Sequence, residues 1–553
     1  MKYLLLLILL FGCSNLPNKA ENNTSSSNNN NSNNNYVPPY EFVRVKGREL
    51  VVGSNETKVI LKGICFGNNV WSQPANPPTT HHQEEDFVRL TNMNINVIRF
   101  YLNYQLFEDD NKPYVYKNTG WQWLDTNIAW AKKYGVYLIF NMHVPQGGFQ
   151  SLGTGNALWN NVENQKRLKA LWKAIAERYK NESIVIGYDL LNEPNTSSSK
   201  EQWINLAKEL VKSIRSVDSN HIIIVERLNA VANNWLADSN MNFFLVDDFN
   251  VMYTFHFYSP IEYTHQFTSW TGFSNQDGGA YPDSNRIQVP DNLEWSEEIV
   301  NTKLYSGSAD WTNIGGVLHR PKPESIVGKP ACKANSNLGV AYFDYFILNE
   351  YDSNSNLIKS ITNDIESIDN WSYWSYNGSG KWGITQLEKK SGNYSIYISN
   401  TTHWANVGAS SWIIVNTNHY YSIKGYIKTA NATGENFFTL DFFKCPSGQK
   451  PAIRDISYLS NEIEKYLQWG RKNNVPLYCG EFGVFIECMT NQSKGGDRWI
   501  KDVVKILRAN GVHCTYHSYH EVGSFGIYTN SGLPQNNTGI QHIIEALKEA
   551  YNY

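Results

Sequence analysis

The sequence predicts an α/β protein, a (β/α)8 TIM barrel with an inserted, antiparallel, jelly-roll-like β-sandwich. Three observations predict this architecture: short apolar runs alternate with longer helical stretches from residue 40 onward, eight such runs are present, and one interval between them is greatly lengthened. The alternation argues for a parallel sheet with crossover helices, and eight units close a barrel. A doubly wound open sheet is the alternative, but the sequence lacks the Gly-rich phosphate turn expected after an early strand.

The eight expected strands are apolar and rich in β-branched residues, as strands buried on both faces should be. In chain order they are residues 59–64, 96–102, 136–143, 184–191, 221–225, 251–256, 475–480 and 512–517. Helical periodicity fills the intervals between them, most clearly at residues 164–179, 200–217 and 499–510. The barrel is therefore expected to comprise residues 40–304 and 451–553.

The interval between the sixth and seventh strands is about 200 residues long, whereas βα loops usually have about 2–6. The helix that should precede the seventh strand is recognisable at residues 456–473, so the extra segment follows the sixth strand. This segment is rich in Ser, Asn and Gly, with short alternating runs at 339–345, 394–398, 412–415 and 437–442. Such runs are typical of an antiparallel sandwich, which we expect to span residues 305–450.

The composition of the chain says more about its possible binding partners than about its activity. The 553 residues carry a net charge of −3, which gives no basis for a nucleic-acid partner. Aromatic residues make up 14% of the chain, with 18 Trp and 34 Tyr. These rings suit either a sugar-binding surface or a large core, and a monomer is expected.

The N-terminus resembles an export signal. A basic start is followed by an apolar run from Leu4 to Phe11 that is too short to span a membrane. Cys13, directly after Gly12, resembles the lipidated cysteine of a bacterial lipobox, although Phe11 is unusual there. We therefore expect a lipoprotein signal at residues 1–20, a flexible Asn/Ser-rich tether at 21–39, and an exported protein whose Cys13 is lipid-anchored to the bacterial cell envelope. The alternative is a plainly secreted protein.

The cysteines and histidines do not form a metal-binding pattern. Apart from Cys13, six cysteines are spaced without a CxxC pair, so neither a zinc site nor any cofactor is expected. Cys332 and Cys445 either pair as a disulfide or remain free thiols. His513, His517 and His520 are close in sequence, but strand alternation puts His520 on the opposite face from the other two.

Polar and ionisable residues gather at the expected carboxyl ends of the strands, where barrel enzymes carry their active sites. They are Arg99, His143, Glu193, His256 with Tyr258, Glu481 and His517. Two carboxylates at opposite strand ends suit glycosidic cleavage, which needs an acid at the leaving oxygen and a second carboxylate near the anomeric carbon.

The motifs around these residues resemble glycoside hydrolase family 5. They are Leu191-Asn192-Glu193-Pro194 after the fourth strand, Gly480-Glu481-Phe482-Gly483 after the seventh, and blocks at 141–148, 255–266 and 525–528. The resemblance covers most of residues 40–300 and 455–550. More weakly, the insert resembles carbohydrate-binding modules of families 4 and 9, in Trp404 and the runs 391–398 and 420–421. A purely structural insert is the alternative.

The resemblance implies a retaining mechanism with Glu193 as general acid/base and Glu481 as nucleophile. It further implies that Arg99 and Tyr258 keep Glu481 ionised and that Asn192 binds the sugar 2-hydroxyl. His143 and His256 would line the substrate cleft.

One position departs from the family pattern. His517 stands where the family usually has a Trp platform, so either His517 forms that wall or Trp71 or Trp159 replaces it.

The expected activity is that of an endo-β-1,4-glucanase acting on a polysaccharide. The alternatives are β-mannan, xyloglucan or mixed-linkage glucan as substrate, or a non-catalytic, glycan-binding surface lipoprotein.

Overall fold

The computed structural model describes residues 41–552, except for positions 73, 152, 237–241, 291, 305, 369–370 and 448. The expected signal at 1–20 with Cys13 and the tether at 21–39 lie outside the described residues. Among the helices that are described, none combines the length and apolar character needed to cross a membrane.

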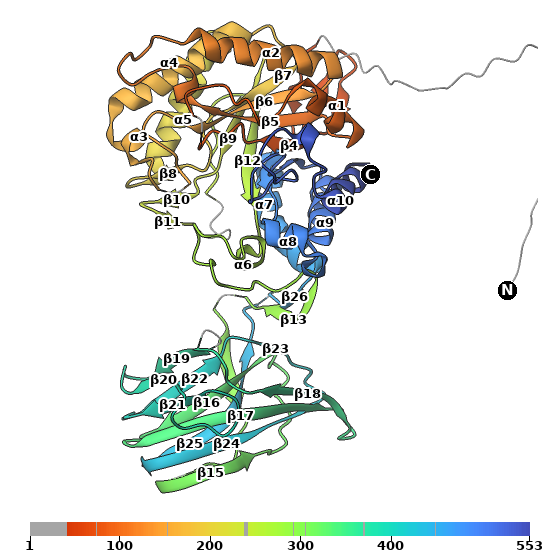
Figure 1. Ribbon diagram of the computed structural model, residues 1–553. Helices are drawn as coiled ribbons and strands as arrows, with labels where there is room; N and C mark the ends of the chain where they lie inside the picture. Colours follow the sequence, from red (N-terminus) through yellow and green to blue (C-terminus); the bar gives the residue numbers. More distant parts are fainter. Residues whose placement is uncertain are drawn as a thin grey trace, which may run out of the picture. The chain divides into compact units, whose positions relative to one another are not determined.

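The predicted barrel is confirmed. Eight strands close in the order β12-β27-β28-β4-β5-β6-β7-β9, and every neighbouring pair is parallel (Figure 1). Along the chain they are β4 (Lys62–Phe66), β5 (Val97–Asn103), β6 (Tyr137–Val144), β7 (Val185–Asp189), β9 (Ile222–Glu226), β12 (Val251–Phe257), β27 (Leu477–Phe482) and β28 (His513–Tyr516). Every residue of β5 and β6 is buried, which is why these strands read as continuous apolar runs.

Ten α-helices are described, all in the barrel part of the chain. They are α1 (Glu84–Asn92), α2 (Asn118–Tyr134), α3 (Asn156–Asn160), α4 (Val162–Tyr179), α5 (Lys200–Arg215), α6 (Ile261–Thr264), α7 (Ile456–Asn473), α8 (Ile486–Thr490), α9 (Gly496–Ala509) and α10 (Gln541–Asn552). Local signals fix their ends: Ser199 forms a capping box with Gln202 at the start of α5, and Gly135 ends α2 in a left-handed conformation. Their apolar faces join the strands in one core.

Short strands complete the barrel part of the chain. An N-terminal antiparallel sheet consists of β1 (Arg44–Lys46), β2 (Glu49–Val52) and β3 (Thr57–Val59). A second small sheet joins the loops that follow β7 and β9, and consists of β8 (Asn195–Thr196), β10 (Ala230–Val231) and β11 (Asn234–Trp235).

The inserted segment forms two six-stranded antiparallel sheets with their own apolar core, as predicted. The first contains β14 (Glu294–Glu298), β25 (Glu435–Lys444), β16 (Val327–Asn335), β22 (Trp404–Ala409), β19 (Trp371–Ser375) and β23 (Ile413–Ile414). The second contains β15 (Gly307–Gly315), β24 (Tyr420–Ala432), β17 (Val340–Tyr351), β21 (Ser395–Ser399), β20 (Lys381–Thr385) and β18 (Leu357–Asn363). The sandwich begins before residue 305, where the sequence placed its start, because β14 already pairs with β25.

The connection between the two parts is one antiparallel pair, β13 (Asp283–Gln288) with β26 (Ala452–Arg454). Arg454, the last residue of β26, is buried, forms an ion pair with Glu262 and donates to the Gly278 carbonyl. The chain thus leaves the barrel and returns to it at adjacent points, so the insertion does not disturb the strand order.

The side chains of the sandwich answer whether Cys332 and Cys445 pair, but they do not answer whether the sandwich binds sugar. Cys332 and Cys445 are free thiols, so of the two alternatives the disulfide is not formed. Trp371 is buried in the sandwich core, whereas Trp374 is 59% and Trp404 37% exposed. The Trp residues therefore divide between core and surface, and sugar binding by the sandwich stays a prediction.

Candidate active site

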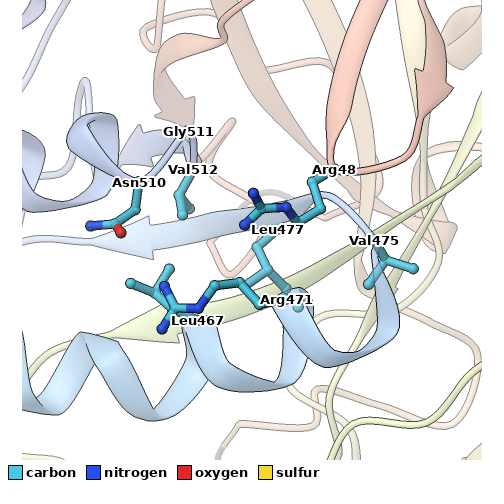
Figure 2. Close-up of a pocket in the computed structure, with 9 residues that line it drawn as sticks. Arg48, Leu467, Arg471, Val475, Leu477, Asn510, Gly511 and Val512 are labelled. Atoms are coloured by element: carbon cyan, nitrogen blue, oxygen red, sulfur yellow. The ribbon is translucent and has the colours of Figure 1, made fainter.

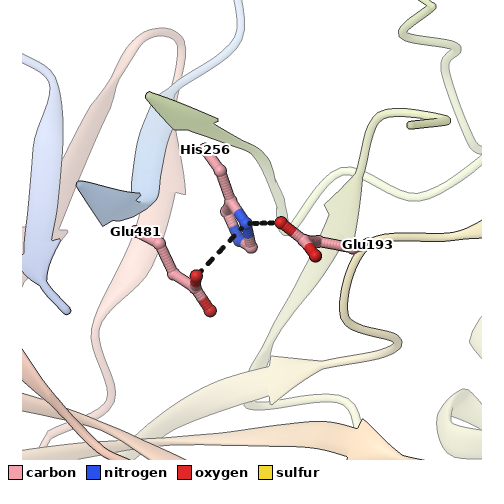
Figure 3. A group of neighbouring side chains, drawn as sticks. All are labelled: Glu193, His256 and Glu481. Carbon is pink, nitrogen blue, oxygen red and sulfur yellow. Dashed lines mark hydrogen bonds and ion pairs between the residues drawn. The ribbon is translucent and has the colours of Figure 1, made fainter. Parts of the chain in front are cut away.

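Glu193 and Glu481 converge at the carboxyl ends of the barrel strands. Glu481 is the second-to-last residue of strand β27, and Glu193 lies in the segment that follows β7. One carboxylate oxygen of each and a ring nitrogen of His256, from β12, lie within 4.8 Å of one another (Figure 3). The structure therefore brings together side chains that the sequence separates by almost 300 positions.

Three donors hold the Glu481 carboxylate. Arg99 Nη1 and the Tyr101 hydroxyl both donate to Oε1 at 2.6 Å, and the Tyr258 hydroxyl donates to Oε2 at 2.8 Å. Burial by itself disfavours the charged form of Glu481. Electrostatic attraction by neighbouring basic groups, with His256 and Arg99 among them, outweighs it and holds the pKa of Glu481 well below its usual range. Glu481 is thus a fixed, ionised carboxylate.

Arg99 connects this carboxylate to two other strand ends. Its Nε donates to Asp189 Oδ2 at 2.8 Å, and its Nη2 donates to Asn192 Oδ1 at 3.0 Å. Since Arg99 and Asp189 are fully buried, each supplies the counter-charge that the other requires. Asn192 is consequently held next to Glu193 with its amide group toward Ser151 Oγ, 3.2 Å away.

His256 sits among three carboxylates. Its Nδ1 lies 2.8 Å from Glu193 Oε1 and 3.5 Å from Glu481 Oε2, and its Nε2 lies 3.6 Å from Glu226 Oε2. Burial opposes its charged form, but Glu226, Glu481 and Glu193 together raise the pKa of His256 to about 9. A protonated imidazole is a donor on both nitrogens, so His256 can bridge these carboxylates by hydrogen bonds.

Aromatic rings line one side of the cluster. His143 stacks on Tyr101 with a centroid separation of 3.9 Å, and its Nδ1 pairs with Asn141 Oδ1 at 3.0 Å. Trp71 meets the His143 ring edge-on at 5.1 Å and remains 40% exposed. Trp71 therefore presents a partly exposed ring against His143 and Tyr101, and its role as the platform in place of the usual Trp stays a prediction.

His517 directly follows β28 and, like Arg99, lies within hydrogen-bond distance of the Tyr101 hydroxyl. Its Nδ1 lies 3.0 Å from the Tyr101 hydroxyl, and its ring packs against Phe525 at 5.4 Å. The other candidate, Trp159, is placed elsewhere: it is 5% exposed, packs against Trp203 in the barrel core and donates to Gln150. The structure thus gives Trp159 a packing role, contrary to its selection as a substrate-binding residue.

Three residues of the cluster were not selected from the sequence. Tyr101 shares a strand face with Arg99, because side chains two residues apart in a strand point the same way, and that spacing could have identified it. Asp189 and Glu226 are carboxylates at the ends of β7 and β9, a signal of the same kind as the one used for the other strands.

A small pocket lies away from these residues, at the amino ends of β27 and β28 (Figure 2). It is lined by both apolar and polar residues: Arg48, Leu467, Gly470, Arg471, Val475, Leu477, Asn510, Gly511 and Val512. In barrels this end contributes to stability and the opposite end carries the chemistry. The pocket therefore does not compete with the carboxylate cluster as the candidate site.

Comparison with known proteins agrees with this geometry. The family model described as Cellulase (glycosyl hydrolase family 5) matches residues 52–298, which include Arg99, Glu193 and His256. Endoglucanase C of Acetivibrio thermocellus is 31% identical over 234 residues, covering 42% of this chain and 64% of the relative. Cellodextrinase A of Ruminococcus flavefaciens is 26% identical over 221 residues, covering 39% and 63%. The chain thus spans less than two thirds of the length of these relatives.

Among solved structures, the endoglucanase Cel5A of Thermotoga maritima is 18% identical with a TM-score of 0.48, covering 88% of this chain and 96% of that protein.

The low pKa of Glu481 has a consequence for stability. Because the pKa is depressed in the folded state, the ionised carboxylate stabilises the fold above about pH 4.5, and this contribution is lost as the pH falls toward the folded-state pKa. We predict that the wild type loses up to about 1.4 kcal/mol more unfolding free energy per pH unit than Glu481→Gln between pH 4.5 and 3.

Urea unfolding followed by far-ultraviolet circular dichroism checks this, because the described α-helices all lie in the barrel part. Glu545→Gln, at an exposed carboxylate on α10, is the control and should follow the wild type. Parallel pH profiles for wild type and Glu481→Gln would contradict the prediction.

Proposed function

We propose that the barrel of this chain is that of a glycoside hydrolase of family 5 and that it hydrolyses a β-linked polysaccharide with retention of configuration, as supported by the family model that matches residues 52–298 and by the 31% identity with Endoglucanase C. Glu193 acts as general acid/base and Glu481 as nucleophile. The observation that carries this proposal is the approach of the two carboxylates. Their nearest oxygens lie within 4.8 Å, close to the separation of about 5–5.5 Å used by retaining enzymes and short of the wider gap of inverting ones.

The environments of the two carboxylates support different roles for them. Glu481 is buried, ionised and fixed by Arg99, Tyr101 and Tyr258, as a nucleophile aimed at an anomeric carbon requires. Glu193 is more exposed, at 17% of its side chain, and its Oε1 pairs with His256 Nδ1 at 2.8 Å, so it can meet both a leaving oxygen and a water molecule. In the first step Glu193 protonates the leaving oxygen as Glu481 forms the glycosyl ester, and in the second it takes a proton from the water that hydrolyses that ester.

The substrate that we propose is a β-1,4-glucan, cleaved internally. This choice of substrate is supported by the similarity to an endoglucanase and a cellodextrinase, and by the exposed Trp71 ring that packs against His143. β-Mannan, xyloglucan and mixed-linkage glucan are the alternatives on the same barrel. A non-catalytic glycan-binding role is disfavoured, because a barrel without catalysis has no need of an ionised Glu481 held by three donors.

Loss of either carboxylate is expected to have a distinct signature. Glu481→Ala should abolish turnover, and azide should restore it with an inverted glycosyl azide as product. Glu193→Ala should lower the rate on substrates with poor leaving groups by about 10²–10⁴-fold, with azide giving a product of retained configuration. Reducing-sugar release and product anomers by NMR measure both. Wild-type activity in Glu481→Ala would refute the assignment.

Substrate preference is tested with a panel of polysaccharides and product-length analysis. We expect the wild type to release a ladder of oligosaccharides from β-1,4-glucan at early times, as internal cleavage does. Trp71→Ala should raise KM on the polymer more than it lowers kcat, since removal of one stacked ring costs ground-state binding. Cleavage of mannan in preference to glucan would replace the proposed substrate while leaving the catalytic assignment intact.

We also propose that the protein is exported and anchored to the cell envelope through lipid on Cys13. The apolar run before Cys13 and the polar tether after it support this placement. Cys13→Ala should release the enzyme from the membrane fraction and abolish labelling by radioactive palmitate. Retention of Cys13→Ala in that fraction would contradict the anchor.

A further inference from the structure

Glu226 is a fully buried carboxylate at the end of β9 that has no role in the two-carboxylate mechanism. Burying a carboxylate is costly unless it is paired and hydrogen-bonded. Its neighbours show how it is accommodated: Asn229 donates to Oε1, and the backbone N–H of Glu193 donates to Oε2 at 2.9 Å. The side chain from one strand end thus binds directly to the backbone of the acid/base residue.

That backbone is held in an unfavourable conformation. Glu193 has a φ of +44°, in the left-handed region that non-glycine residues rarely occupy, and such a conformation costs about 1–3 kcal/mol. Further contacts fix the same turn, since the N–H groups of Asn229 and Ala230 both donate to the Pro194 carbonyl, at 3.0 and 3.2 Å. The loop after β9 therefore clamps the turn that carries Glu193, with Glu226 at its centre.

Glu226 also faces His256 from the side opposite Glu193. Its Oε2 lies 3.6 Å from His256 Nε2, while His256 Nδ1 lies 2.8 Å from Glu193 Oε1. Within the described residues, His256 Nε2 has no hydrogen bond, so the Glu226 carboxylate is the group that this nitrogen faces. A single side chain thus contacts both the backbone of Glu193 and the imidazole that binds its carboxylate.

From these contacts we propose that Glu226 is a positioning residue for acid/base catalysis, which fixes the turn of Glu193 and orients His256 toward the Glu193 carboxylate. This inference rests on the proposed function. It implies that loss of Glu226 weakens proton donation to the leaving oxygen and leaves attack by Glu481, which Arg99, Tyr101 and Tyr258 hold independently, largely unaffected.

The experiment compares leaving groups. Aryl β-glycosides of the disaccharide that the wild type cleaves, beginning with cellobiose, are assayed as dinitrophenyl and unsubstituted phenyl glycosides. A dinitrophenolate departs without protonation, whereas a phenol needs the acid. In Glu226→Gln we expect kcat/KM to fall about 10- to 100-fold for the phenyl glycoside and less than about threefold for the dinitrophenyl one.

Two further variants separate positioning from structure. Glu226→Ala should show the same selectivity with a larger loss, because it removes the acceptor for the Glu193 N–H as well as the charge. Glu108→Gln removes an equally buried carboxylate, which pairs with Arg167 outside the site, and should leave the ratio between the two substrates unchanged.

Equal losses on both substrates in Glu226→Gln, or no loss on either, would overturn the positioning role. The proposed function fails in a different way, namely if the wild type hydrolyses neither polysaccharide nor aryl glycoside. If the wild type is active and Glu226→Gln loses the same fraction of kcat/KM on both aryl glycosides, only the positioning role of Glu226 is contradicted.

Discussion

The site depends on the ion pairs that the buried Arg99 guanidinium forms. A charge with no exposed surface must be matched by opposite charge, and Arg99 meets this requirement with Asp189 on one side and Glu481 on the other. These residues come from β5, β7 and β27, none of which is directly paired with another in the barrel. The low pKa of Glu481 therefore depends on a cation that a different strand supplies.

The dependence of the site on strand ends also explains how a whole sandwich can be inserted between Glu193 and Glu481 in the sequence. What the site requires is the position of each strand end, and β12 and β27 still pair directly although the sandwich lies between them in sequence. The chain departs and returns through the β13–β26 pair, so the insertion closes a loop whose ends are already adjacent. A long insertion with adjacent ends adds little strain to the structure that carries it.

Most of the barrel and the centre of its site could be predicted from the sequence, because both leave strong local patterns. Strands buried on both faces appear as apolar runs, and polar residues at their ends stand out against them.

The features that the sequence did not predict correctly have physical reasons as well. Tyr101 looks like one more apolar core residue until its hydroxyl is seen to reach Glu481, and Trp159 looks like a sugar platform although its ring packs on Trp203. Whether a ring is covered depends on tertiary packing, which sequence spacing does not report. The start of the sandwich was misplaced for a similar reason, since β14 is a short strand defined by its partner β25.

The positive charges of Arg99 and His256 explain how four carboxyl groups can lie close together at the carboxyl end of the barrel. Arg99 and His256 carry positive charge, whereas Glu193, Glu226, Glu481 and Asp189 are all potential anions, so the cluster favours retention of protons. Burial, reinforced by Glu193 and Asp189 against the opposing charges of His256 and Arg99, raises the pKa of Glu226 to about 7, and burial raises that of Asp189 as well, while Glu481 stays ionised. In the proposed mechanism Glu481 becomes a glycosyl ester, so one negative charge disappears and a charge on Glu193 then faces one fewer anion. Since His256 lies between the two carboxylates, loss of the Glu481 charge would also leave His256 paired with Glu193 and Glu226 alone, as a residue that gives up a proton in one step and accepts one in the next would require.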